Sequence, residues 1–233
     1  MIDALMPARV DGNFSWVRVG SPNDGGYVVA RPGDRKPEGL LSFGGGENME
    51  FERDAAMQGI DVFCIDPAHR EDAESNPGMV RGELGREWHR GTVNAWRMLH
   101  DSAWLKIDCE GAEWDFFTSM PSAELARFDQ IVVEFHGLAW GGWEQKAEAL
   151  GRLRQRHALV HLHANNYGGE RRRYRCRVPD TVECTYLLRE LAGKDAPGRW
   201  RRSPLDAPNN PRRREIDAGE LVAGWRAWLE STY

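Results

Sequence analysis

GLLSFGGGENMEFERDAAMQGIDVFCID, residues 39–66, contains the alternation that decides the fold. An apolar stretch, Gly39–Phe43, ends in three glycines; Glu50–Gly59 has the composition of a helix; Ile60–Ile65 is a second apolar stretch, ending at Asp66. Short apolar segments on either side of a helix indicate a β-loop-α-β unit, in which a crossover helix joins two parallel strands. The sequence therefore predicts an α/β protein.

The same alternation continues towards the C-terminus. Further strands are expected at Met79–Leu84, Ala103–Asp108, Gln130–His136, Ala158–His163 and Thr181–Leu188, and helices at Thr92–His100, Trp114–Met120, Ser122–Arg127 and Trp143–Arg156. Several strands are apolar throughout, which is typical of a parallel sheet whose two faces are both covered. We expect a sheet of about seven strands with helices on both faces.

No repeat and no long linker interrupts the chain, so a single domain is expected over residues 1–233. Residues 1–38 are interpreted as an N-terminal extension that contains a strand at Phe14–Val19. Residues 193–233 are interpreted as a basic loop followed by a C-terminal helix.

This last segment has two parts. Residues 193–214 are rich in Pro, Arg, Asn and Gly and are expected to form an exposed loop. Asp217 can cap a helix that runs to Glu230, with apolar residues on one face.

The overall composition excludes disordered and fibrous proteins, because 41% of the residues are hydrophobic and ten are Trp. No apolar run is long enough to cross a membrane, and the N-terminal residues lack the pattern of a signal peptide. A cytoplasmic protein without a membrane partner is expected.

The net charge of −5 combines two opposed halves. Residues 38–134 carry 20 acidic and 8 basic side chains, whereas residues 152–214 carry 16 basic and 6 acidic ones. Arginine supplies most of the basic charge. A coding bias explains this simply, and recognition of phosphate or carboxylate is the functional alternative.

The first candidate site residues follow the first two strands of the sheet. Gly44, Gly45 and Gly46 let the backbone approach a bound cofactor closely, and Asp66, about 20 residues later, can hold the ribose of an adenosine. Glu47 would repel a pyrophosphate and suits a cofactor with a cationic sulfonium. These residues favour S-adenosylmethionine as the cofactor.

Further candidates lie where the later strands end. Residues two apart in a strand share a face, so three pairs can each lie side by side: Asp108 with Glu110, Glu134 with His136, and His161 with His163. Polar groups at the ends of apolar strands are costly to bury without partners, and this indicates a site. His161 lies farther from its strand end and is interpreted as a core residue.

Four segments together resemble the FkbM-type and related methyltransferase-like family of class I S-adenosylmethionine-dependent methyltransferases. They are Arg18–Ser21 with Asn23–Val29; Ser42–Gly44 with Phe51 and Glu52; Lys106–Trp114; and His163–Asn166 with Pro179, Asp180 and Val182–Tyr186. The resemblance implies a Rossmann-like, seven-stranded sheet whose last strand is antiparallel. It also implies O-methylation of a hydroxyl on a sugar, glycan or natural product.

In the mechanism we expect, the acceptor oxygen attacks the methyl group in line while a base removes its proton. Gly44, Gly45 and Gly46 would line the cofactor, with Glu47 near its methionine portion and Asp66 at the ribose.

Asp108 and Glu110 would lie beside the sulfonium and the acceptor. His136 or His163 would be the base, because imidazole titrates near neutral pH. A variant uses Mg²⁺ held by Asp108, Glu134, His136 and Asn165.

Two rival functions remain open. An NAD-dependent oxidoreductase would share Asp66, but the chain lacks the third glycine of the dinucleotide fingerprint. A nucleic-acid-binding protein or RNA methyltransferase would use the basic stretches Arg171–Arg175 and Arg212–Arg214. Short arginine runs in loops are usually solvated, so we expect a small-molecule or glycan acceptor.

Overall fold

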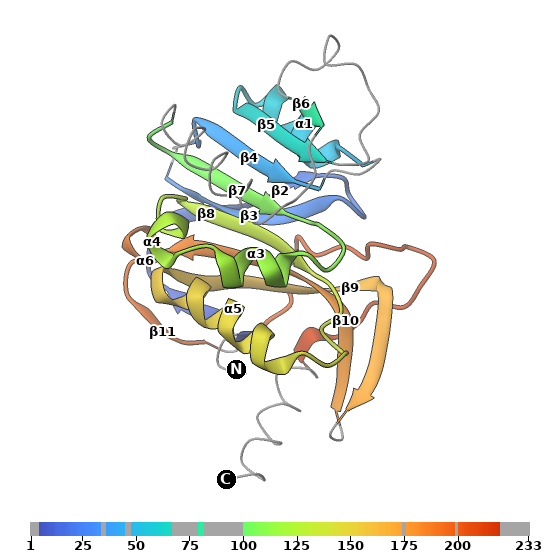
Figure 1. Cartoon of the computed structure of the whole chain (residues 1–233). Coiled ribbons are helices and arrows are strands. Elements are labelled where there is room, and N and C mark those ends of the chain that lie inside the picture. Colours follow the sequence, from blue (N-terminus) through green and yellow to red (C-terminus); the bar gives the residue numbers. More distant parts are fainter. Residues whose placement is uncertain are drawn as a thin grey trace.

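A computed structural model of the chain describes residues 5–33, 36–44, 48–66, 79–81, 100–173, 176–198 and 200–219 (Figure 1). The strands are β1 (Ala8–Val10), β2 (Phe14–Gly20), β3 (Gly26–Pro32), β4 (Gly39–Phe43), β5 (Asp61–Asp66), β6 (Met79–Arg81), β7 (Ala103–Ile107), β8 (Gln130–Phe135), β9 (His157–Arg173), β10 (Cys176–Leu188) and β11 (Asp195–Pro197). The helices are α1 (Glu50–Met57), α3 (Glu113–Ser119), α4 (Ser122–Leu125), α5 (Trp143–Arg156) and α6 (Arg189–Ala192).

The central sheet has the strand order β6-β5-β4-β7-β8-β10-β9. Neighbours from β6 to β8 are parallel, and β10 is antiparallel to both β8 and β9. The predicted α/β class and the mostly parallel sheet are confirmed. After β4 the chain adds β5 and β6 on one side and then crosses to β7 and β8 on the other, so the strand order reverses between β4 and β7. Ligands of open parallel sheets bind at such a reversal, beyond the carboxyl ends of the strands.

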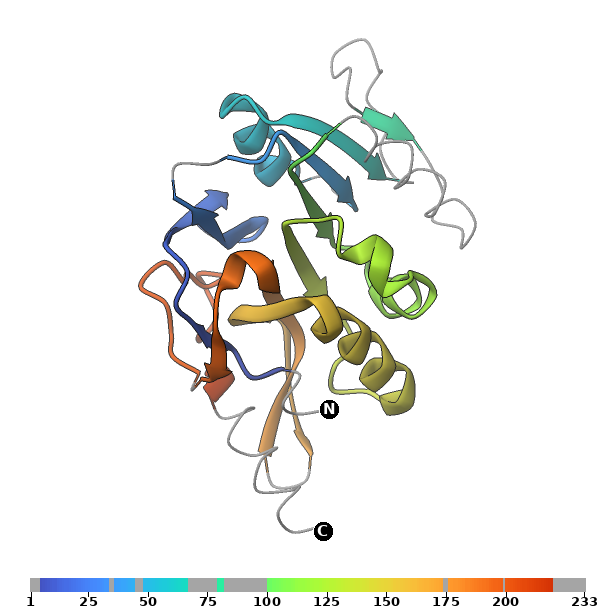
Figure 2. The same ribbon diagram turned by 90° about the vertical axis from the view of Figure 1, so that its left-hand side faces the viewer.

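One face of the sheet is covered by helices α3, α4 and α5, as Figure 2 shows for α3 and α5. Side chains alternate between the faces of a strand, and every second residue of β4, β7 and β8 is apolar and buried against these helices. They are Leu41, Phe43, Leu105, Ile107, Ile131, Val133 and Phe135. This apolar layer is the main core.

The other face is covered by α1 and by the hairpin of β2 and β3, so the expectation of helices on both faces is only partly correct. Tyr27 and Val29 of the hairpin are buried against this face. Thr185 donates a hydrogen bond to the Val28 carbonyl at 2.5 Å, and the Ala30 N–H donates to the side chain of Gln130 at 2.8 Å. The N-terminal segment therefore packs on the sheet through both apolar and polar contacts.

Strands β9 and β10 extend well beyond the predicted strand bounds. Their ladder continues from Pro179 paired with Glu170 to Cys176 paired with Arg173, although the arginine run at 171–175 was expected to lie in a loop. The hydrophobic pattern stops here because this part of the hairpin projects past the sheet, as Figure 1 shows, and its side chains at 167–172 are largely exposed. Residues 166–180 are called the hairpin extension below.

Residues 200–217 lie against β9, where residues 193–214 were expected to form an exposed loop. We call residues 200–217 the strap. Trp200 anchors it by donating its indole N–H to the Leu162 carbonyl at 2.9 Å. The expected helices at 92–99 and beyond residue 219 lie outside the described residues. Within the described part of the chain, no helix has the length and hydrophobicity to cross a membrane.

Candidate functional site

The polar residues of the site share the face of the sheet that the β2–β3 hairpin covers. Ser42 lies opposite Lys106 in the ladder of β4 and β7, and Glu183 lies opposite Glu134 on one side and His163 on the other. Neighbouring residues at one level of a sheet project to the same face. This shared level places Glu183 and His163 beside Glu134, near the carboxyl ends of the parallel strands β4, β7 and β8.

Gly44 directly follows β4 and has a conformation that requires glycine. Its φ is 76°, and a Cβ added to it would lie 1.6 Å from the carbonyl oxygen of Asp108. No side chain fits there, so the backbone of β4 approaches that of β7 at the reversal of strand order. The sequence-predicted Gly45, Gly46 and Glu47 follow directly and lie outside the described residues.

Asp66 is the last residue of β5 and is 3% exposed. The register pairs Phe43 of β4 with Ile65 of β5, so Asp66 follows at the same level as Gly44. The two residues predicted from their spacing therefore lie at adjacent strand ends.

Tyr27 joins two carboxyl groups at the centre of the site. Its hydroxyl oxygen lies 3.0 Å from Asp108 Oδ2 and 3.0 Å from Glu134 Oε2. Burial, followed by the charges of Asp108 and Glu134, raises the pKa of Tyr27 well above its usual value, so the phenol stays protonated. A phenol has one proton to donate, and therefore the second contact requires a proton on a carboxyl group. The contacts of Tyr27 thus indicate that Asp108 and Glu134 share one proton between their carboxyl groups.

The pKa values of the two carboxyl groups are consistent with this shared proton. Burial, together with the charges of Asp108 and Glu183, raises the pKa of Glu134 well above its usual range. Burial also raises the pKa of Asp108, although Lys106 and His136 oppose the effect. The Asp108 side chain is 25% exposed and that of Glu134 is 8% exposed, so Asp108 is the more accessible of the two.

His136 lies among four carboxylates. Nδ1 is 2.9 Å from Glu113 Oε1, while Nε2 is 3.5 Å from Glu134 Oε1, 3.5 Å from Glu110 Oε2 and 3.9 Å from Asp108 Oδ1. Burial alone would lower the pKa of His136, but the hydrogen bond and charge of Glu113, with the other acids, raise it to about 9. The imidazole is therefore protonated at neutral pH, which differs from the neutral base expected from the sequence.

Glu113 holds the loop that leads from β7 into α3. Its Oε1 accepts the backbone N–H of Cys109 at 2.8 Å and that of Gly111 at 3.2 Å, besides its contact with His136. The loop needs this support because Glu110 has a φ of 51°, a conformation that is unfavourable for a side chain of this kind. Glu113 therefore positions both His136 and the loop that carries Glu110.

Lys106 is a buried cation below the site. Its ammonium group lies 3.1 Å from Glu52 Oε1 and 3.7 Å from Asp108 Oδ2, and it donates to the Gly44 carbonyl at 2.9 Å. Burial alone would lower the pKa of Lys106, but Glu52 and Asp108 outweigh burial and raise it. Ser42 donates a further hydrogen bond to Glu52 at 2.5 Å. The group thus ties β4, β7 and α1 together beneath Gly44.

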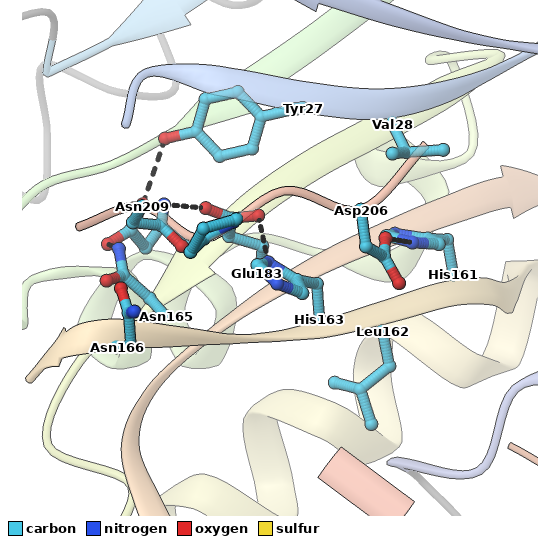
Figure 3. Close-up of polar contacts among 12 residues, drawn as sticks. Tyr27, Val28, His161, Leu162, His163, Asn165, Asn166, Glu183, Asp206 and Asn209 are labelled. Carbon is cyan, nitrogen blue, oxygen red and sulfur yellow. Dashed lines mark hydrogen bonds and ion pairs between the residues drawn. The ribbon is translucent and has the colours of Figure 1, made fainter. Parts of the chain in front are cut away.

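His163 is held by two carboxylates, as Figure 3 shows for Glu183. Nδ1 lies 2.9 Å from Glu183 Oε2, and Nε2 lies 2.6 Å from Glu215 Oε1 of the strap. Burial alone would lower the pKa of His163, but these two hydrogen bonds raise it to about 10. Both ring nitrogens are engaged and the ring is protonated at neutral pH, so this arrangement leaves His163 no nitrogen for a substrate proton.

Two more polar residues of β9 hold the strap. His161 Nε2 lies 2.7 Å from Asp206 Oδ1 (Figure 3), and the amide of Asn166 bonds the backbone of residues 210, 213 and 214. Asn209 extends the network by donating to Glu183 and, at 3.2 Å, to Asp24 near the N-terminus. His161, His163 and Asn166 of β9 are therefore all bonded to the strap.

Stability should depend on His163 at alkaline pH. Its folded pKa of about 10 exceeds the ordinary value of 6.5, so its contribution is complete below about pH 6.5 and is lost as the pH rises towards 10. Urea denaturation at several pH values should show that His163→Gln removes on the order of 3 kcal/mol of the loss between neutral pH and pH 10. His100→Gln, at the opposite edge of the sheet, is the control. The same pH dependence in His163→Gln and the wild type would contradict this assignment.

A metal ion fits this donor set only in part. In the described residues, ligand atoms of Asp108, Glu113 and His136 lie within 4.8 Å of one another. However, Glu113 and His136 already bond each other, and the Glu113 oxygen involved also accepts two backbone N–H groups. Asn165, expected as a ligand, has its amide oxygen occupied by a backbone N–H at 2.8 Å and its nitrogen donating to Glu134. These residues therefore do not form a ready set of metal ligands.

Three contributors to the site were not predicted as site residues. Tyr27, Glu52 and Glu113 were included only in motifs of the resemblance. The turn-rich residues 21–26 ahead of Tyr27 mark a hairpin but do not indicate where it packs. Only the acidic first turn of α3, which favours a helix N-terminus, gave a local signal for Glu113.

No protein-family model matches this chain, and no curated protein matches it in sequence. Several solved structures resemble it in part. Methanococcus jannaschii fibrillarin, a pre-rRNA processing protein, is 9% identical with a TM-score of 0.40, covering 68% of this chain and 69% of its own. TrmN from Thermus thermophilus is 11% identical with a TM-score of 0.35, covering 66% and 45%. TrmK, the M1A22 tRNA methyltransferase of B. subtilis, is 9% identical with a TM-score of 0.27, covering 65% and 61%. These scores are too low to assign a family or a function.

Proposed function

We propose that this protein is an S-adenosylmethionine-dependent methyltransferase. The observation that carries the proposal is the convergence of Gly44, Asp66 and an acidic cluster where the strand order reverses. Gly44 lets the chain turn tightly after β4 while packing against the backbone of Asp108, and Asp66 supplies a carboxylate at the next strand end. A cluster rich in carboxylates suits a cationic sulfonium better than a pyrophosphate. NAD is disfavoured on this ground and by the missing third glycine.

In this proposal the backbone at Gly44 and the following Gly45 and Gly46 line the cofactor. Asp66 accepts hydrogen bonds from the ribose hydroxyls, and Glu47 lies near the methionine portion. Asp108 and Glu110 lie on the acceptor side, where their negative charge favours binding of the cationic sulfonium over binding of the uncharged thioether product. The cofactor supplies the methyl group, and the chain aligns the acceptor for in-line attack.

We further propose Asp108 as the base that removes the acceptor proton. The pKa values of His136 and His163, about 9 and about 10, leave both rings protonated at neutral pH. Asp108 has a raised pKa, which makes it a stronger base than an ordinary aspartate, and its side chain is partly exposed. His136 positions Asp108, and Tyr27 with Glu134 forms the hydrogen-bonded support behind it. A hydroxyl acceptor and the FkbM-type subfamily belong to the same proposal.

Binding of S-adenosylhomocysteine, measured by isothermal titration calorimetry, tests the cofactor. We expect saturable binding to the wild type, and Asp66→Ala should weaken it by about 10- to 100-fold, because hydrogen bonds to a charged group contribute about 1.5–3 kcal/mol. Asp61→Ala changes the opposite end of the same strand and should bind like the wild type. Binding of NADH in place of S-adenosylhomocysteine would contradict the proposal.

A further inference from the structure

The hairpin extension and the strap together present a basic surface. Eight described arginines on these two segments are exposed, and they are Arg171, Arg172, Arg177, Arg201, Arg202, Arg212, Arg213 and Arg214. Among the described side chains of the same segments, only Glu170 and Asp217 are exposed acids. The extended strands and the strap spread these guanidinium groups over a length of chain, so the surface can contact several anionic groups of one ligand at once.

Two aromatic side chains lie on this surface, and each has an arginine beside it. Trp140 is 49% exposed, and the guanidinium of Arg171 lies over its ring at 3.4 Å from the centroid. Tyr167 is 50% exposed, and the guanidinium of Arg213 lies 6.0 Å from its ring. Large exposed aromatics with adjacent guanidinium groups are typical platforms for unstacked bases.

A cavity of about 210 Å³ lies between the hairpin extension and the strap. Its charged lining residues are three arginines and three acids, namely Arg177, Arg213 and Arg214 with Glu170, Glu215 and Asp217. Arg213 also fixes the segment by donating to the Tyr167 carbonyl at 2.7 Å. Three carboxylates line the cavity beside these guanidinium groups and Arg177 pairs with Glu170, so the preference of the surface for anions rests on its exposed arginines and not on the cavity.

The surface adjoins the candidate site through short stretches of chain. Tyr167 donates its backbone N–H to the side chain of Asn165, which in turn donates to Glu134 of the site at 2.8 Å. Trp140 lies four residues after His136, and its turn is tied to the hairpin extension by a hydrogen bond from Leu138 to Asp180 at 2.7 Å. A ligand on this surface can therefore reach the carboxyl ends of β8 and β9.

We propose that the hairpin extension and the strap bind single-stranded nucleic acid, and that this nucleic acid is the methyl acceptor. The part concerning the acceptor rests on the proposed methyltransferase function. Arginines engage the phosphates, while Trp140 and Tyr167 stack on bases and direct the chain towards Asp108. This differs from the small acceptor expected from the sequence, because that expectation treated the arginines as solvated loop residues and not as parts of an ordered hairpin and strap.

A smaller anion accounts for less of the surface. A sugar phosphate occupies one or two guanidinium groups and offers one ring, whereas the surface carries eight arginines and two separate aromatic side chains. A polyanionic polysaccharide would use the charges, but its binding would not depend on both aromatic rings in the way that base stacking does. The two aromatic residues therefore separate the ligand classes.

The test is fluorescence anisotropy of the full chain with a labelled single-stranded RNA of about twelve nucleotides, at about 50 and 200 mM salt. Arg171→Gln with Arg213→Gln should weaken binding at least about tenfold and lower the salt slope by about one. Trp140→Ala with Tyr167→Ala should weaken it at least about tenfold with little change in the slope. Arg53→Gln with Arg156→Gln removes the same charge from α1 and α5 and should bind like the wild type.

Tyr167→Phe keeps the ring and should retain binding where Tyr167→Ala does not. No RNA binding by the folded wild type, or equal losses in the α1 and α5 control, would overturn the proposal. Heparin competition together with unaffected binding by the aromatic variants would also overturn it in favour of a polysaccharide. RNA binding without S-adenosylhomocysteine binding would support the surface and reject the methyltransferase, and the reverse pattern would reject the surface alone. A single-stranded DNA of the same sequence reveals whether the ribose hydroxyls are read.

Discussion

Asp108→Asn is expected to lower the rate of methyl transfer by about 10²- to 10⁴-fold, the usual contribution of a general base. Asparagine keeps the shape of the side chain and its contact with Tyr27 but cannot accept a proton from the acceptor. S-adenosylhomocysteine carries no sulfonium charge, so its affinity, measured by calorimetry, should change little. The rate should be measured as transfer of a labelled methyl group from S-adenosylmethionine, with single-stranded RNA and hydroxyl-rich glycans as acceptors.

The pH dependence of this reaction has a defined sign. The raised pKa of Asp108 means that the base becomes active as the pH rises through that pKa, so the wild-type rate should increase with pH over this range. Asp61→Asn, at the far end of β5, is the matched control and should keep the wild-type profile. Retention of more than about a tenth of the rate in Asp108→Asn would rule out this base. Loss of wild-type turnover in EDTA would instead assign Asp108 to a cation.

Lys106→Met is expected to lower the free energy of unfolding by about 3–5 kcal/mol, the usual effect of leaving a buried charge without its partner. The Lys106 and Glu52 side chains are each only 2% exposed, so water cannot replace the lost contact. Urea denaturation measures the effect. Lys36→Met removes an exposed ammonium group bonded to the Gln58 carbonyl and should change stability by less than about 0.5 kcal/mol.

The double variant Lys106→Met with Glu52→Leu separates the ion pair from simple loss of packing. Replacing both charges with apolar residues removes the unpaired carboxylate, so the double variant should be more stable than Lys106→Met alone. The coupling between the two substitutions should exceed about 1 kcal/mol. Additive effects of the two single variants would show that the pair does not act as a unit.

Local sequence patterns were sufficient to predict much of the sheet and the strand-end residues. Helix α5 has its predicted bounds, Trp143–Arg156, because its apolar positions recur at helical spacing over a long segment. Gly44, Asp66 and Asp108 were predicted because parallel strands that leave the same edge place their final residues together. In these cases the prediction needs only residues that are close together in the sequence, at or near a strand end.

The remaining features depend on contacts between distant segments. Residues 167–172 of the hairpin extension lack an apolar pattern because their side chains are largely exposed, so the β-pairing there leaves no hydrophobic signal. The strap is polar because its polar groups bond histidine and asparagine side chains of β9. A free loop has the same polar composition, so the composition does not distinguish the two. Likewise, the histidines suggested a neutral base because the bonds of Glu113 to His136, and of Glu183 and Glu215 to His163, join segments that are distant in the sequence.

The contacts of Tyr27 have a consequence for how the protein acquires its structure. Its hydroxyl contacts Asp108 and Glu134, which lie 81 and 107 positions further along the sequence, and Asp24 contacts Asn209, which lies 185 positions further along. Contacts of such long range form slowly because a large loop must close before they contribute any stability. During synthesis, the N-terminal hairpin therefore packs on the sheet only after the later strands and the strap have formed. Asp24 and Tyr27 make their contacts near the end of folding.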